Sequence, residues 1–144
     1  MKPGRELDKL VARVFGWKEW EFGSPGRDGQ EAFRYKTLVP PEYDGSNLQH
    51  LNMIIPHYST DIRAAMDAWD WLEKNNSWDK AGLFLGKVEE FDESGDKMQH
   101  LGVFLLKDDY VDMGVLYDLE KIAVGETYPH AIALAILETT KEKR

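Results

Sequence analysis

The sequence predicts an α+β fold, a single-domain α/β/α sandwich with a mostly antiparallel sheet and about three helices. Three segments carry apolar residues at helical spacing, near the beginning of the chain, around residue 65 and after residue 128. Two apolar runs without polar alternation flank a polar turn at residues 92–97, which predicts a hairpin. Strands of this kind are typically covered on both faces, and helices on both sides of the sheet would cover them.

The first helix is predicted in the N-terminal segment and should end at Gly16. Its apolar stripe follows the helical period and consists of Leu7, Leu10, Val11, Val14 and Phe15. Gly16 suits the position where a left-handed residue closes the last turn of a helix. We expect Trp17 to fold back onto this end of the helix.

The second helix is predicted to follow Pro56 and to end near residues 75–76. Ser59 or Thr60 can accept a hydrogen bond from a free first-turn amide, and Asp61 favours the positive end of the helix dipole. The apolar face of this helix consists of Ile62, Ala65, Met66, Trp69 and Leu72.

The third helix is predicted from Tyr128 to about residue 142, with Thr127 as its N-cap. Pro129 lies in its first turn, where the missing N–H group costs little. Apolar residues surround much of this helix, and its small alanines permit close packing on a sheet.

Four strands are predicted, at residues 33–39, 82–91, 98–106 and 116–124. Residues 107–114 are acidic and are interpreted as a turn. Turn signals interrupt the remainder of residues 18–57, where residues 51–55 form either a short strand or a buried connector.

The composition excludes several classes of protein. The chain has 144 residues, one domain in length, with 18 basic and 26 acidic side chains and a net charge of -8. This balance argues against general nucleic-acid binding, which needs basic surface. The absence of cysteine excludes disulfides and thiolate sites. No apolar run is long enough for a membrane span and no signal peptide is recognised, so the expected location is the cytoplasm.

No sequence motif indicates catalysis. The four histidines lack the i, i+4 spacing of a zinc helix, and neither a G-x-S-x-G turn nor a phosphate-binding glycine loop occurs. We therefore expect no catalytic residue, no metal ion and no cofactor.

Three segments occur in a recognisable order. They are residues 5–8 with Val11, Ala12, Gly16 and Trp17; residues 58–62 with Ala64 and Ala65; and residues 127–135. Together they resemble the phage ABA sandwich domain family, small proteins encoded by phages and prophages of Gram-positive bacteria. The resemblance implies an α/β/α sandwich over residues 1–144 and a location in the bacterial host. It implies no catalytic residues.

The leading functional hypothesis is a non-enzymatic phage accessory protein that binds a host protein, a phage protein or a second copy of itself. Aromatic side chains near the ends of elements, or away from the core face of a helix, would form the contact. The candidates are Trp17, Trp20, Trp71 and Trp78. Binding to nucleic acid or to a membrane is not expected.

Two alternatives remain open. Free amides at two helix N-termini could bind a nucleotide or another phosphorylated ligand. The residues of this hypothesis are Tyr58, Ser59, Thr60, Asp61, Thr127, Tyr128 and His130. In the second alternative the protein is an acidic DNA mimic that inhibits a nucleic-acid enzyme. Its acidic residues would be Glu89, Glu90, Asp92, Glu93, Asp96, Asp108, Asp109 and Asp112.

Overall fold

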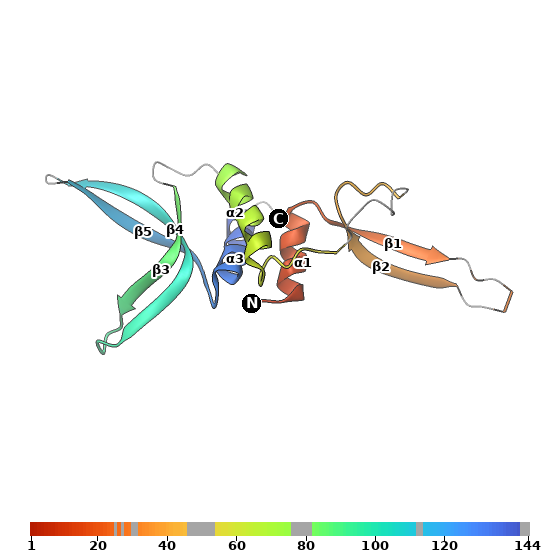
Figure 1. The fold of residues 1–144 in the computed structure, drawn as a ribbon, viewed down its shortest axis with the longest axis horizontal. Helices are drawn as coiled ribbons and strands as arrows, with labels where there is room; N and C mark the ends of the chain where they lie inside the picture. Colours follow the sequence, from red (N-terminus) through yellow and green to blue (C-terminus); the bar gives the residue numbers. More distant parts are fainter. Residues whose placement is uncertain are drawn as a thin grey trace.

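Three helices and five strands are formed by the residues that the structure describes (Figure 1). This computed structural model describes residues 1–24, 26, 28–29, 32–45, 54–75, 82–111 and 114–141, with only the backbone of residues 24, 90, 106–111 and 114–119. In chain order the elements are α1 (Arg5–Val14), β1 (Lys18–Ser24), β2 (Phe33–Val39), α2 (Ile62–Asn75), β3 (Leu83–Phe91), β4 (Lys97–Val111), β5 (Gly114–Gly125) and α3 (Tyr128–Thr140).

The strands form two antiparallel sheets. β1 and β2 pair as a hairpin, and β3, β4 and β5 form a three-stranded sheet in that order. The predicted α+β class, the three helices and the antiparallel pairing are therefore confirmed.

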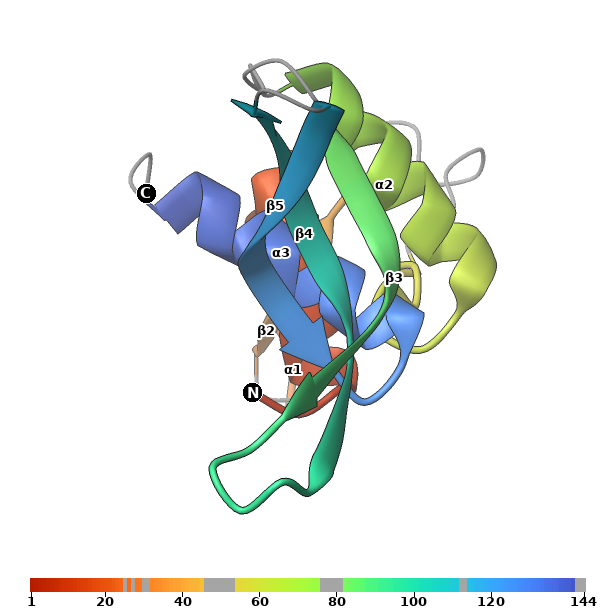
Figure 2. The same ribbon diagram turned by 90° about the vertical axis from the view of Figure 1, so that its left-hand side faces the viewer.

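The helices lie between the two sheets. The β3–β4–β5 sheet lies at one end of the molecule and the β1–β2 hairpin projects from the other (Figure 1). α3 packs on β4 and β5 and also contacts α1 and α2. Seen from the sheet end, all three helices lie behind the three-stranded sheet (Figure 2). Within the described residues, helices therefore cover one face of this sheet rather than both.

Two aromatic rings lie on the outward face of β3 and β4. Phe84 and Phe104 are paired across β3 and β4, with ring centroids 6.2 Å apart. The ring of Phe84 crowds the space above Gly86, and the ring of Phe104 the space above Gly102. Although it lies on this face, Phe104 is only 3% exposed. An apolar strand can thus bury side chains without a second helical layer.

The core lies between the helices and the inward face of the sheet. Its fully buried side chains come from each helix and from β4, and the largest apolar ones include Leu7, Val11, Leu72, Val103, Ile132 and Ile136. α3 is the central helix, which explains why apolar residues surround most of it.

α1 ends as predicted. Gly16 has a φ of +95°, its N–H donates to the Arg13 carbonyl over 3.1 Å, and the Trp17 N–H donates to the Ala12 carbonyl over 3.0 Å. These two bonds form the Schellman closure of a helix. Trp17 is partly buried against the core, so it does fold back onto the helix end.

The starts of the other two helices correct one prediction and confirm another. Asp61 caps α2, because its Oδ1 accepts a hydrogen bond from the Arg63 N–H over 2.9 Å. Ser59 does not cap α2, because its side chain bonds to α1 instead. Thr127 caps α3 and accepts from the His130 N–H over 3.3 Å.

The strand predictions missed two features. β1 was not predicted, although Trp20 and Phe22 alternate with charged residues there. Residues 107–111, interpreted as part of a turn, belong to β4 and pair with β5, with Lys107 opposite Asp118. Backbone pairing with a neighbouring strand, which is a tertiary interaction, outweighs the local polar composition here.

Candidate functional site

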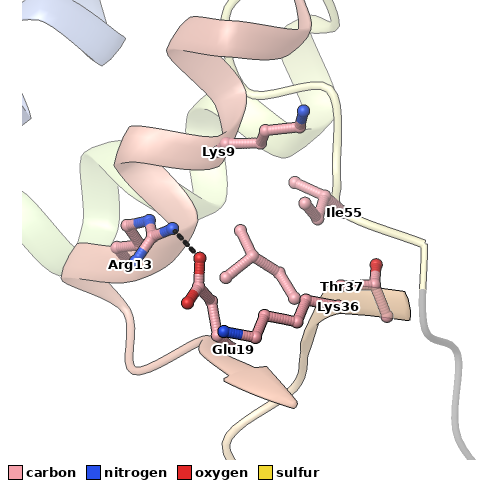
Figure 3. A pocket seen from close by; sticks show the side chains of 7 residues that line it. Lys9, Arg13, Glu19, Lys36, Thr37 and Ile55 are labelled. Atoms are coloured by element: carbon pink, nitrogen blue, oxygen red, sulfur yellow. Dashed lines mark hydrogen bonds and ion pairs between the residues drawn. The ribbon is translucent and has the colours of Figure 1, made fainter. Parts of the chain in front are cut away.

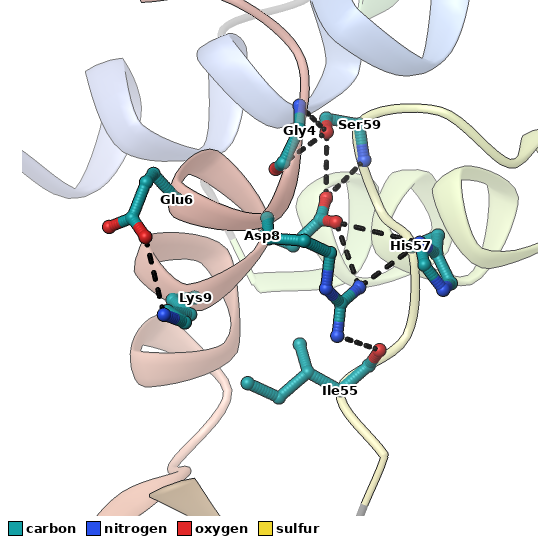
Figure 4. A network of polar contacts seen from close by, with 8 residues as sticks. Gly4, Glu6, Asp8, Lys9, Ile55, His57 and Ser59 are labelled. Atoms are coloured by element: carbon teal, nitrogen blue, oxygen red, sulfur yellow. Dashed lines mark hydrogen bonds and ion pairs between the residues drawn. The ribbon is translucent and has the colours of Figure 1, made fainter. Parts of the chain in front are cut away.

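A buried carboxylate joins α1 to the segment that precedes α2 (Figure 4). Asp8 is 0% exposed. Its Oδ1 accepts from the Ser59 amide over 2.8 Å and from the Ser59 hydroxyl over 2.7 Å. Its Oδ2 lies 3.0 Å from Arg5 Nη1, and Arg5 Nη2 donates to the Ile55 carbonyl over 2.9 Å. The Ser59 hydroxyl also accepts from the Gly4 amide.

This cluster contains Asp, His and Ser side chains but lacks the geometry of a catalytic triad. The Ser59 hydroxyl donates directly to Asp8 and is buried. His57 Nδ1 lies 3.1 Å from Arg5 Nη1 and 3.9 Å from Asp8 Oδ2, so His57 is not placed between the other two groups. A triad requires the histidine to bond to the nucleophile. The arrangement therefore stabilises the contact between α1 and the start of α2.

The amides proposed to bind a phosphorylated ligand near residue 60 are used within the protein. The Ser59 amide donates to Asp8, and the amides of Thr60 and Asp61 both donate to the His57 carbonyl. The Tyr58 amide donates to the Pro56 carbonyl.

The N-terminal turn of α3 also makes hydrogen bonds within the protein. His130 is 5% exposed, and its Nδ1 accepts from the Glu126 amide over 2.9 Å. An amide can only donate, so Nε2 carries the ring proton and donates to the Met1 carbonyl over 2.7 Å. Residues 1–4 thus contact both predicted ligand-binding segments, through Met1 at His130 and through Gly4 at Ser59. Tyr128 is half-buried in the first turn.

Tyr58, a predicted site residue, has a raised pKa. It is buried, and its ring makes an edge contact with Phe15 at 5.2 Å between centroids. Burial, followed by the negative charges of Asp67 and Asp8, raises the pKa of Tyr58 to about 12.

Tyr58→Phe should reduce the amount by which the free energy of unfolding falls as pH rises from 10 to 12. Between pH 10 and 12 the folded protein keeps a tyrosine proton that the unfolded chain releases, so this group lowers the free energy of unfolding as pH rises. We expect wild type to lose about 2 kcal/mol more than Tyr58→Phe across this window. Urea unfolding at both ends of the window measures the difference. Equal losses in both proteins would contradict the assignment.

The four candidate tryptophans have different positions. Trp17 and Trp71 are partly buried against the core, and Trp71 makes an edge contact with Phe15 at 5.1 Å between centroids. Trp20 lies in β1, outside the core cluster. Trp78 lies outside the described residues. Of the described three, Trp20 alone belongs to the projecting hairpin.

Trp20 is part of a larger aromatic surface on the hairpin. The register pairs Phe22 with Tyr35, and residues at alternate positions share a face. One face therefore holds Trp20, Phe22, Phe33 and Tyr35, which we call the aromatic face. Tyr35 stacks on Phe22 at 5.4 Å and contacts Phe33 at 5.3 Å.

Exposure on the aromatic face increases toward the tip of the hairpin. Near the root, Tyr43 is buried and contacts Trp20 with ring centroids 4.9 Å apart. Nearer the tip, Tyr35 is 48% and Phe33 is 61% exposed. Sequence reasoning identified Trp20 but missed the other three residues. Their signal was the alternation of aromatic with charged residues in two neighbouring segments.

The opposite face of the hairpin is charged. β1 contributes Glu19 and Glu21, and β2 contributes Arg34 and Lys36. Glu21 lies 3.7 Å from Arg34, and Glu19 lies 3.2 Å from Arg13 of α1. The hairpin is therefore amphipathic: Tyr43 contacts its aromatic face at the root, and Phe33 and Tyr35 are exposed nearer the tip.

The acidic turn between β3 and β4 serves local structure. Asp92 Oδ1 accepts from the Ser94 amide, the Ser94 hydroxyl and the Asp96 amide, over 2.9, 2.6 and 2.8 Å. Chiefly through the Ser94 side chain, these bonds hold the pKa of Asp92 below its usual value. Beside the turn, Glu89 pairs with Lys97 at 3.0 Å. The side chains of Glu90, Asp108, Asp109 and Asp112 lie outside the described part of the chain.

Two further properties concern the described residues alone. Among them, no group of three or more His, Asp or Glu side chains is placed to hold a metal ion. No helix in the same part of the chain is both long and apolar enough to cross a membrane.

Comparisons with known proteins find no relative. No family model, no curated protein and no solved structure matches this chain. The resemblance to the phage ABA sandwich family therefore stays a prediction, and any functional proposal must rest on the geometry of the described residues.

Proposed function

We propose that this protein acts by protein–protein association, and that the aromatic face of the β1–β2 hairpin is the contact surface. The partner we propose is a second copy of the chain. In this proposal the protein is a non-enzymatic accessory protein. The observation that carries it is the exposure of Phe33 and Tyr35 on a hairpin that projects from the helices.

Association through the aromatic face would also stabilise the outer part of the hairpin. An isolated two-stranded sheet is marginally stable in water. Here the root is held by Tyr43, Leu38 and Val39, which are buried, while residues 33–37 are exposed. Covering the outer aromatic rings would remove apolar area from water, at about 25 cal/mol per Å².

The distribution of charge favours contact through the hairpin. Residues 1–45 contain 8 basic and 8 acidic side chains, whereas residues 46–144 contain 10 basic and 18 acidic ones. The surplus of negative charge therefore belongs to the second part of the chain, which forms α2, α3 and the three-stranded sheet. Two copies that meet through their hairpins keep these acidic parts at opposite ends of the dimer, which reduces their repulsion.

The edges of the hairpin favour contact between faces rather than between strands. Joining two β1 edges would bring Glu19 and Glu21 near their counterparts, and joining two β2 edges would do the same for Arg34 and Lys36. Like charges at a strand edge oppose such pairing. Two aromatic faces can instead stack as packed sheets do, at a spacing of about 10 Å.

The double variant Phe33→Thr, Tyr35→Thr tests the proposal. Threonine keeps the preference for a strand and removes the rings. Light scattering and sedimentation up to about 100 µM should show a dimer for wild type. For the double variant we expect a Kd at least about thirtyfold higher, as for the loss of a hot spot.

Arg34→Thr is the matched control, because it changes the same strand on the opposite face. It should leave the dimer intact, and backbone NMR shifts of residues 18–24 and 33–39 should show that the hairpin is folded in every variant. A monomeric wild type, or equal weakening by Arg34→Thr and the double variant, would overturn the proposal.

A further inference from the structure

A small cavity with a basic rim lies at the root of the hairpin (Figure 3). Its volume is about 190 Å³. α1 contributes Lys9 and Arg13 to the rim, and β2 contributes Lys36. Leu38 and Ile55, both buried, line its inner side. The described lining therefore combines two apolar side chains with the Thr37 side chain, three cationic groups and one acidic group.

The three cations converge because of their positions in two elements. Lys9 and Arg13 are four residues apart, so they lie on the same side of α1. Lys36 lies on the charged face of β2, opposite Glu21 in the register. Among the described residues that line the cavity, Glu19 is the one acidic side chain. The described lining residues thus carry a net charge of +2 in a protein whose overall net charge is -8.

The cationic groups are available to a ligand. Lys9 pairs with Glu6 at 3.2 Å, and Arg13 pairs with Glu19 at 3.2 Å. All four side chains are about half exposed or more. Exposed ion pairs of this kind contribute little to stability, so replacing the Glu6 and Glu19 carboxylates by the oxygens of a ligand costs little free energy. Lys36 makes no ion pair with any described residue.

We propose that this cavity binds a small dianion, a phosphate monoester or a dicarboxylate with a short apolar part. Arg13 can hold two anionic oxygens with its guanidinium, Lys9 and Lys36 supply point charges, and Leu38 and Ile55 contact the apolar part. The volume lies below the roughly 300 Å³ at which pockets for drug-sized ligands begin, so the ligand is smaller than a nucleotide. This site is separate from the aromatic face and does not depend on self-association.

Calorimetric titration of the full chain with inorganic phosphate and with succinate tests the site. Lys36→Gln removes one cation and should weaken binding about tenfold. Glu19→Gln removes the acidic group beside Arg13 and should tighten binding several-fold. Arg34→Gln is the matched control, since this residue lies on the same strand and face but does not line the cavity, and it should change little.

The results of the two titrations distinguish a phosphate monoester from a dicarboxylate as the ligand. Binding of phosphate alone assigns the site to phosphate monoesters, and binding of succinate assigns it to dicarboxylates. Failure of both anions to bind at about 10 mM would overturn the proposal. So would an equal loss in Lys36→Gln and Arg34→Gln, which indicates general surface charge. The oligomeric state of the same samples reports separately on the proposed function.

Discussion

Asp8→Ala is expected to lower the free energy of unfolding by about 2–4 kcal/mol. The carboxylate is fully buried and accepts both the amide and the hydroxyl of Ser59. Its removal leaves the buried Ser59 amide without its acceptor and leaves the Ser59 hydroxyl to the Gly4 carbonyl, 3.2 Å away. We place the cost below that of a fully buried ion pair, because Arg5 is 42% exposed and water can solvate it when Asp8 is lost.

Urea unfolding of Asp8→Ala should be compared with that of Glu6→Ala. Glu6 lies on the same helix and pairs with Lys9, but it is exposed, so its loss should cost less than about 1 kcal/mol. Asp8→Asn should fall between the two, since its amide oxygen can still accept both bonds from Ser59 but its amide nitrogen cannot accept from Arg5. If Asp8→Ala were no more destabilising than Glu6→Ala, Asp8 would not be the group that joins α1 to the start of α2.

His130→Ala is expected to lower the free energy of unfolding by about 2–3 kcal/mol. The imidazole is nearly buried and bonds to the Glu126 amide and to the Met1 carbonyl, so it joins Met1 to the turn between β5 and α3. Alanine removes both bonds and leaves a cavity. Faster hydrogen exchange at the Glu126 amide should accompany the loss.

His57→Ala provides the comparison for His130→Ala. His57 is exposed and contacts Arg5, so its replacement should cost less than about 1 kcal/mol. The two histidines differ in burial and not in chemistry. Equal effects of the two substitutions would show that the bonds of His130 to Glu126 and Met1 contribute nothing.

Local signals in the sequence predicted the ends of two helices correctly. Gly16 closes α1 and Thr127 caps α3, because left-handed backbone and side-chain capping depend on one or two residues. The start of α2 was less predictable. Ser59 or Thr60 was predicted as the cap, but Asp61 caps the helix, and Ser59 bonds instead to Asp8, which lies 51 residues away in the chain.

The candidate site was only partly predictable. Trp20 was identified as a residue near the end of an element, but Phe33 was assigned to a half-buried strand and not to a contact surface. Whether a strand residue is exposed depends on what packs against the sheet. Here the helices stop at the root of the hairpin, so the aromatic rings nearer the tip have no cover from the described residues.

By itself the sequence determined the α+β class, the three helices and the antiparallel hairpin of β3 and β4. These follow from the period of apolar residues and from turn residues, which act over short distances along the chain. The tertiary structure alone decided that the helices lie between two sheets, that residues 1–4 close both proposed ligand-binding termini, and that three cations meet at one cavity. Each of these depends on contacts between residues far apart in the chain, and the local periodicity of apolar residues does not predict such contacts.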